Sequence, residues 1–90
     1  MLDEDLLKLM SDFPSDMYKI MKALKPFEDE EYKEHYRKIQ ASRKRYFDLK
    51  KKYFENTDES NIKELLYEIH RGCLFAKYIR ENIIEIGGDE

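Results

Sequence analysis

The chain has 90 residues, of which 41% are charged and 41% hydrophobic, and its formal net charge is −3. This length allows one domain with a modest core, and the composition is typical of a helical bundle with a solvated surface. No apolar run approaches the roughly 18–20 residues that a membrane span needs, and the N-terminus is acidic, unlike a signal peptide. A single cysteine cannot form an internal disulfide. We therefore expect a cytoplasmic protein without a membrane segment.

Residues 1–25 are predicted to form a kinked helical arm. Because the residue before a proline is pushed out of the α region, Phe13 should close a first helical segment at Pro14. Ser15 and Asp16 suit the N-terminal cap of a second segment. The apolar residues at helical spacing are Leu2, Leu6, Leu9, Met10 and Phe13 in the first segment, and Met17, Ile20, Met21 and Leu24 in the second.

Two long helices are predicted to follow, over residues 26–55 and 61–86. Pro26 suits the first turn of the earlier helix. Asn61 begins a capping-box pattern at the start of the later one, and two glycines after residue 86 form a strong C-terminal signal. Residues 87–90 are expected to be a disordered tail.

The two long helices carry apolar stripes that match when one helix is folded back on the other through a polar loop at residues 56–60. In each stripe, seam residues recur every seventh position, which predicts an antiparallel, coiled-coil-like helical hairpin. The expected pairs are Tyr53 with Ile62, Leu49 with Leu65, Tyr46 with Ile69, Ser42 with Gly72, Ile39 with Ala76 and Tyr32 with Ile83. A small residue at both Ser42 and Gly72 suggests a close approach of the helices at mid-seam.

The N-terminal arm is expected to lie in a groove of this hairpin. Only a tight turn separates Leu24 from the long helix, so the arm runs back toward the loop end, where it should cover Phe47 and Phe54. The predicted fold is therefore an all-α, three-helix bundle in which residues 1–90 form a single helical domain.

The sequence offers little for catalysis. No cluster of His, Cys and acidic residues has metal-ligand spacing, and there is no Gly-rich phosphate loop. His35 falls on the core stripe opposite Ile79, with Glu31 one turn away, and Cys73 is expected among the small residues of the seam. We predict no catalytic residue, metal, cofactor or small-molecule substrate, and hence a protein that is not an enzyme.

A block of eight basic residues and one acid lies between positions 37 and 52. Six of the basic residues form two heptad rows on the face opposite the seam, a spacing that suits a phosphate backbone. These basic rows are Arg37, Lys44 and Lys51, and Lys38, Arg45 and Lys52. The alternative is a solvated face whose charge complements the helix dipole and the acidic first half of the same helix.

A second surface feature is an apolar stripe on the last helix, roughly opposite the seam. Exposed aromatic side chains beside an arginine are enriched at protein interfaces, and the arm can cover only one groove of the hairpin. The residues of this stripe are Tyr67, Arg71, Leu74, Phe75 and Tyr78. The sequence thus predicts an accessory or regulatory subunit that binds itself or a partner protein through this face, with nucleic-acid binding by the basic rows as the alternative.

Overall fold

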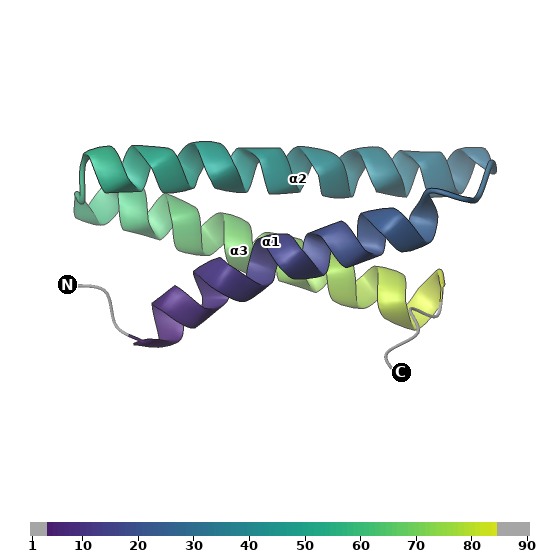
Figure 1. Ribbon diagram of the computed structural model, residues 1–90, viewed down its shortest axis with the longest axis horizontal. Coiled ribbons are helices and arrows are strands. Elements are labelled where there is room, and N and C mark those ends of the chain that lie inside the picture. Colours follow the sequence, from purple (N-terminus) through teal and green to yellow (C-terminus); the bar gives the residue numbers. More distant parts are fainter. Residues whose placement is uncertain (1–3, 85–90) are drawn as a thin grey trace.

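The computed structural model describes residues 4–84, and these residues form three helices. They are α1 (Glu4–Leu24), α2 (Glu30–Glu55) and α3 (Glu59–Asn82). α2 and α3 form an antiparallel hairpin along the long axis of a molecule that measures 42 × 26 × 16 Å, and α1 crosses this hairpin obliquely (Figure 1). The predicted all-α, three-helix bundle is confirmed.

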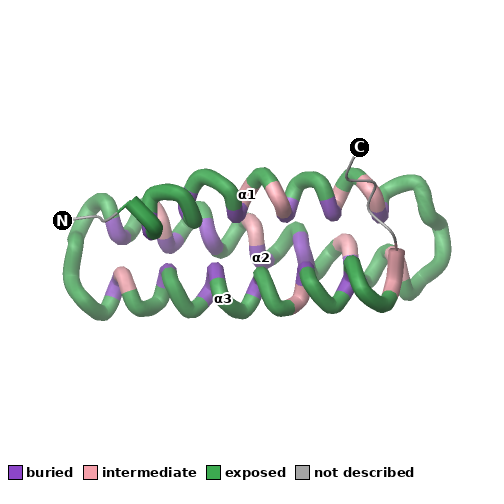
Figure 2. Tube along the Cα trace, turned by 90° about the horizontal axis from the view of Figure 1, so that it is seen from below, coloured by how far each residue is buried: buried purple, intermediate pink, exposed green. Residues whose placement is uncertain are grey.

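The core runs along the hairpin on the side where α1 packs. The buried positions of all three helices point toward one another (Figure 2). Each helix contributes one stripe with the spacing of a helix face, as the sequence predicts. The buried apolar residues are Leu6, Met10, Phe13, Met17, Ile20 and Leu24 in α1, Ile39, Tyr46, Leu49 and Tyr53 in α2, and Leu65, Ile69, Ala76 and Ile79 in α3.

The predicted register of the hairpin agrees with contacts near both of its ends. At one end, the Tyr32 hydroxyl donates a hydrogen bond of 3.3 Å to the carbonyl oxygen of Ile83. Near the loop, Lys52 and Glu64 form an ion pair of 3.2 Å across the two helices. The outermost seam residues Tyr32, Ile62 and Ile83 are only partly buried, because fewer neighbours surround them at the ends of the bundle.

α2 ends at Glu55 as predicted, but the other ends of the two long helices differ from the predicted ones. α2 begins at Glu30, because the chain uses residues 25–29 to reverse direction after α1. α3 begins at Glu59, so Asn61 lies inside the helix and not at its cap. The Asn61 amide instead donates a hydrogen bond of 2.7 Å to the carbonyl oxygen of Asn56, which ties the α2–α3 loop to the helix. α3 ends at Asn82, and the predicted tail at 87–90 lies outside the described residues.

The prediction that Pro14 ends a helical segment is wrong, because α1 continues through it. A proline inside a helix removes the donor for the carbonyl four residues earlier, which here is Met10. The buried hydroxyl of Tyr46 on α2 donates a hydrogen bond of 2.6 Å to that carbonyl oxygen. The contact between α1 and α2 therefore satisfies the group that the proline leaves without a partner, and local sequence carries no sign of this.

Gly72 lies against α1, a contact that the sequence did not predict. A Cβ atom added at this position would lie 2.6 Å from Cζ of Phe13 and 2.9 Å from Cε of Met17, both on α1. Real Cβ contacts are essentially never under 3.0 Å. The glycine thus makes room for α1 where it crosses α3, whereas the sequence suggested that it lets Ser42 and α2 approach.

The expectation that the arm covers Phe47 and Phe54 is also wrong. Both rings are exposed, by 40% and 53% of their surface. α1 packs on the stripe that contains Tyr46 and Tyr53, and each phenylalanine follows one of these tyrosines in the sequence. Consecutive helical residues point about 100° apart, so the phenylalanines lie on the outer flank of α2.

Candidate functional site

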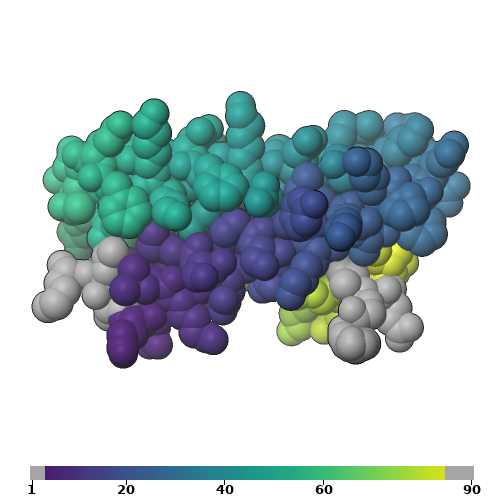
Figure 3. Space-filling view, in the orientation of Figure 1, coloured from purple at the N-terminus to yellow at the C-terminus, as the bar shows by residue number. Residues whose placement is uncertain are grey.

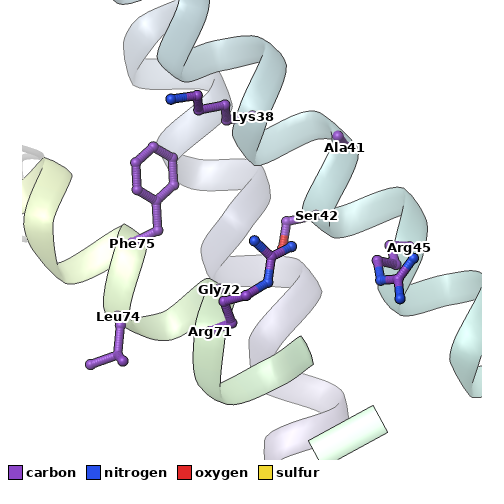
Figure 4. Close-up of a pocket in the computed structure, with 8 residues that line it drawn as sticks. All are labelled: Lys38, Ala41, Ser42, Arg45, Arg71, Gly72, Leu74 and Phe75. Carbon is purple, nitrogen blue, oxygen red and sulfur yellow. The ribbon is translucent and has the colours of Figure 1, made fainter. Parts of the chain in front are cut away.

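The α2–α3 hairpin has two long sides, and α1 covers only one of them. On the other side, an open groove of about 680 Å³ lies between the helices, with α1 passing behind it (Figure 4). Phe75 and Leu74 supply apolar surface on α3, and small residues form its floor. The groove is lined by Lys38, Ala41, Ser42 and Arg45 of α2 and by Arg71, Gly72, Leu74 and Phe75 of α3.

A buried carboxylate lies between the two helices beside this groove. The side chain of Glu68 is only 2% exposed, and it accepts a hydrogen bond of 2.8 Å from the Ser42 hydroxyl. Arg45 from α2 and Arg71 from α3 bind it at 3.1 and 3.0 Å, and both guanidinium groups remain accessible to solvent. Sequence reasoning missed Glu68. The signal was its position three residues after Leu65 and four before Gly72, which places an acid on the core stripe.

The predicted interface stripe lies beside the groove. Tyr67 and Leu74 are 66% and 56% exposed, and Tyr78 is exposed to a similar degree. Phe75 is partly buried, because its ring packs 5.7 Å from the His35 ring and lies under the ammonium group of Lys38. Tyr67, Leu74, Phe75 and Tyr78 therefore form an apolar band, which we call the α3 band, while Arg71 points to Glu68.

The basic rows are less free than their sequence suggests. Arg37 is bound by Glu30 and Glu34, and its hydrogen bond lowers the pKa of the Glu34 carboxyl below the ordinary value. Arg45 is bound by Glu68 and Lys52 by Glu64. These carboxylates neutralise half of the six predicted contacts to nucleic acid.

The remaining three cations of the rows form no ion pair with a carboxylate of residues 4–84. The Nζ atom of Lys38 lies 5.9 Å from the centroid of the Phe75 ring, and both residues line the groove. Within residues 4–84, no carboxylate lies at ion-pair distance from Lys44 or Lys51, and both side chains are exposed. The net positive charge of α2 is therefore concentrated on fewer positions than the rows imply.

His35 lies in the core, as predicted. Both of its ring nitrogens are buried and have no hydrogen-bond partner among the described residues. The nearest carboxylate oxygen, on Glu31, is 3.9 Å from Nε2, which is too long for a hydrogen bond. The ring instead packs against Phe75 and Tyr78. His35 thus supports the α3 band from below.

The sequence suggested that Cys73 lies in the seam, but the residue is exposed. It follows Gly72, and a step of one residue turns its side chain away from the helix contact. Partial burial raises the pKa of the thiol, and the negative charge of Asp16 on α1 raises it further. A thiol with a raised pKa is a weak nucleophile at neutral pH.

Within residues 4–84, no group of three or more His, Cys, Asp or Glu side chains is placed to hold a metal ion. None of the described helices is long and apolar enough to cross a membrane. No protein-family model, curated protein or solved structure matches the chain.

Proposed function

We propose that this protein is a small non-enzymatic interaction module, an accessory or regulatory subunit of the cytoplasm, that binds a protein partner through the outer face of α3. The observation that carries the proposal is the exposed α3 band, which continues into the open groove through Leu74 and Phe75. Exposed aromatic side chains next to an accessible arginine are the composition of interface centres.

The charge of the groove favours one kind of partner. Lys38, Arg45 and Arg71 line it, and Glu68 is the one carboxylate bound by two of them. Three cations against one anion leave a formal charge of +2. Two identical faces packed together would bring these like charges close to one another, at an energetic cost. The groove is better suited to an amphipathic helix of another protein whose apolar residues are flanked by Asp and Glu.

The proposal is tested by the double substitution Leu74→Glu and Tyr78→Glu. Both side chains are exposed, so the variant should fold, and circular dichroism checks this. Affinity capture from the native cell is then compared for wild type and variant, and light scattering measures the mass of each protein in solution. We expect the variant to lose a captured protein whose release from the wild type increases with salt.

Leu7→Glu with Tyr18→Glu provides a matched control. These residues of α1 have the same chemistry and are also about half exposed, but they lie outside the α3 band. The control should keep the partner. If wild type is monomeric and every captured protein also binds the Leu74→Glu and Tyr78→Glu variant, the α3 band is not an interface. A wild-type dimer that this variant abolishes would identify a second copy as the partner.

A further inference from the structure

A second exposed stripe lies on α2, on a flank that neither α1 nor α3 covers. It consists of Lys44, Phe47, Lys51 and Phe54, which we call the Lys–Phe stripe. Spacings of three and four residues place these side chains on one face of a helix. All four are exposed, and the two rings lie about 10 Å apart along the helix axis. Cations and aromatic rings therefore alternate along this face.

The charges of this stripe differ from those of its neighbours on α2. Arg45 and Lys52, one position further along the sequence than Lys44 and Lys51, turn toward α3 and are bound by Glu68 and Glu64. Lys44 and Lys51 have no carboxylate partner among residues 4–84. Asp48 borders the same shallow hollow as Lys44 and Phe47, but it forms no ion pair with Lys44.

The ring of Phe47 is held in place by Arg43. The Arg43 side chain donates a hydrogen bond of 3.0 Å to the carbonyl oxygen of Pro14 on α1. Its guanidinium carbon lies 5.0 Å from the centroid of the Phe47 ring and 5.5 Å from that of Tyr18, a cation–π arrangement. This bridge joins α2 to α1. The two helices lie against each other along a boundary that is visible in Figure 3. The Phe47 ring is therefore exposed but restrained by Arg43, so binding would cost it less conformational entropy than it would cost a freely rotating ring.

We propose that the Lys–Phe stripe binds single-stranded nucleic acid, with unpaired bases stacked on Phe47 and Phe54 and backbone phosphates bound by Lys44 and Lys51. Exposed aromatic rings and cations that follow one another are the two components of single-strand binding sites. A duplex keeps its base faces stacked inside, so it offers the phosphates but not the stacking.

The composition of the stripe separates this ligand from an anionic membrane. Membrane binding by a helix grows with its buried apolar area, and the stripe supplies only two rings. In the hollow beside Phe47, Met21 is the one apolar neighbour, and the other lining residues are polar or charged. The first turn of α1 contains Glu4 and Asp5, and α1 begins toward the end of the molecule that holds the α2–α3 loop (Figure 1). Negative charge at this end repels phosphates. We therefore expect moderate affinity that is measurable at low salt.

The test is fluorescence anisotropy with a labelled oligothymidylate and a DNA duplex of equal length, both at low salt. The wild type should bind the single strand more tightly than the duplex. Phe47→Leu and Phe54→Leu remove the rings but keep apolar side chains, and each should weaken binding to the single strand by about tenfold. Phe54→Tyr keeps a stacking surface and should bind like the wild type.

A charge-matched pair of variants tests the role of the lysines. Lys44→Gln with Lys51→Gln should weaken binding and reduce the slope of log affinity against log salt by about 1.4, which is the value for two single-strand phosphates. Arg37→Gln with Lys52→Gln changes the net charge by the same amount, but both of these cations are held by carboxylates. This second pair should bind nearly as tightly as the wild type.

Several results would overturn the proposal. They are an absence of wild-type binding at low salt, equal losses from the two pairs of cation variants, or duplex binding as tight as single-strand binding with no effect of the leucine variants. Binding to phosphatidylserine vesicles in place of the oligonucleotide would assign the stripe to a membrane surface. The Leu74→Glu and Tyr78→Glu variant should keep full oligonucleotide binding, so this site and the α3 band can succeed or fail separately.

Discussion

The two sides of the α2–α3 hairpin are stabilised by different kinds of contact. On the side that α1 covers, rings and aliphatic side chains fill the space up to the backbone of Gly72, and the polar hydroxyl of Tyr46 bonds to a backbone carbonyl. On the open side, a carboxylate from α3 is bound by arginines that stay in contact with water. The first side tolerates little change of shape, whereas the second can rearrange when a partner binds.

The largest effect is expected at the crossing of α1 and α3. Gly72→Leu should lower the free energy of unfolding by about 3 kcal/mol, because the new side chain overlaps Phe13 and Met17. Ala41→Leu makes a similar change on the exposed wall of the open groove and should cost less than about 0.5 kcal/mol. Denaturant unfolding of both variants measures the difference between the two sides.

A compensating substitution identifies the residue that meets Gly72. If Phe13 is that residue, Phe13→Leu should relieve part of the cost of Gly72→Ala, so the double variant is more stable than the sum of the single effects. Ser42→Gly should bring no such relief. Relief by Ser42→Gly in place of Phe13→Leu would mean that α2, and not α1, lies against the glycine.

Removal of the Tyr46 hydroxyl should have the next largest effect. Tyr46→Phe leaves the Met10 carbonyl without its donor and should cost about 2 kcal/mol. Pro14→Ala restores a backbone N–H to this turn, so the cost of Tyr46→Phe should be smaller in that background. A double-mutant cycle in urea measures the coupling, and strictly additive effects would disprove the link between the proline and the tyrosine.

The same tyrosine gives a pH dependence. Burial raises the pKa of Tyr46 above the ordinary value of about 10. The folded protein therefore keeps this proton at a pH where the unfolded chain releases it. Its contribution to stability is complete below the ordinary pKa and is lost as the pH rises through the folded value. The alkaline loss of stability should be smaller in Tyr46→Phe.

A smaller effect is expected on the open side. Glu68→Gln keeps the size of the side chain but removes the charge that binds Arg45 and Arg71, and it should cost about 1 kcal/mol. Glu64→Gln breaks the exposed ion pair with Lys52 and should lower the free energy of unfolding by only about 0.3 kcal/mol. Thermal unfolding of the two variants at low and high salt compares them. Equal effects would mean that burial of Glu68 adds nothing to its ion pairs.

The smallest effect concerns reactivity and not stability. Because the pKa of Cys73 is raised, its alkylation by iodoacetamide at neutral pH should be slower than that of a free cysteine. Asp16→Asn removes the charge that raises this pKa and should increase the rate. Arg80→Gln should decrease it, because the Arg80 charge lowers the pKa. An unchanged rate in Asp16→Asn would show that the Asp16 charge does not act on the thiol.

The sequence was sufficient to predict the hairpin and its register. Both follow from the regular spacing of apolar residues that a helix with one buried face requires. It was not sufficient at Pro14, Gly72 and Glu68. The donor for the Met10 carbonyl, the atoms that fill the space above the glycine and the arginines around the carboxylate all come from other helices. Local rules describe a helix before its neighbours are known, so they cannot predict such contacts.

On the surface, too, some features could be predicted from the sequence and others depend on contacts between helices. The exposure of Tyr67, Leu74 and Tyr78 follows from their position opposite the seam, whereas Phe75 of the same band is partly buried. The sequence did not predict which cations of α2 are neutralised, because Glu30, Glu34, Glu64 and Glu68 reach them across turns or helices. It also did not predict that Phe47 and Phe54 stay exposed, since this depends on the path of α1.

Pro14 also separates α1 into two parts that should open at different rates. A missing backbone hydrogen bond interrupts the cooperative ladder of a helix, so the turns on either side can open separately. The turns before Pro14 are attached to the rest of the molecule by Leu6, Met10 and Phe13 and by the hydroxyl of Tyr46. Amide hydrogens of residues 5–13 should therefore exchange with solvent as one group and faster than those of residues 17–24. When these turns open, Phe13 moves away from Gly72 and the first half of α1 no longer covers the core. The contacts between α2 and α3 remain in place.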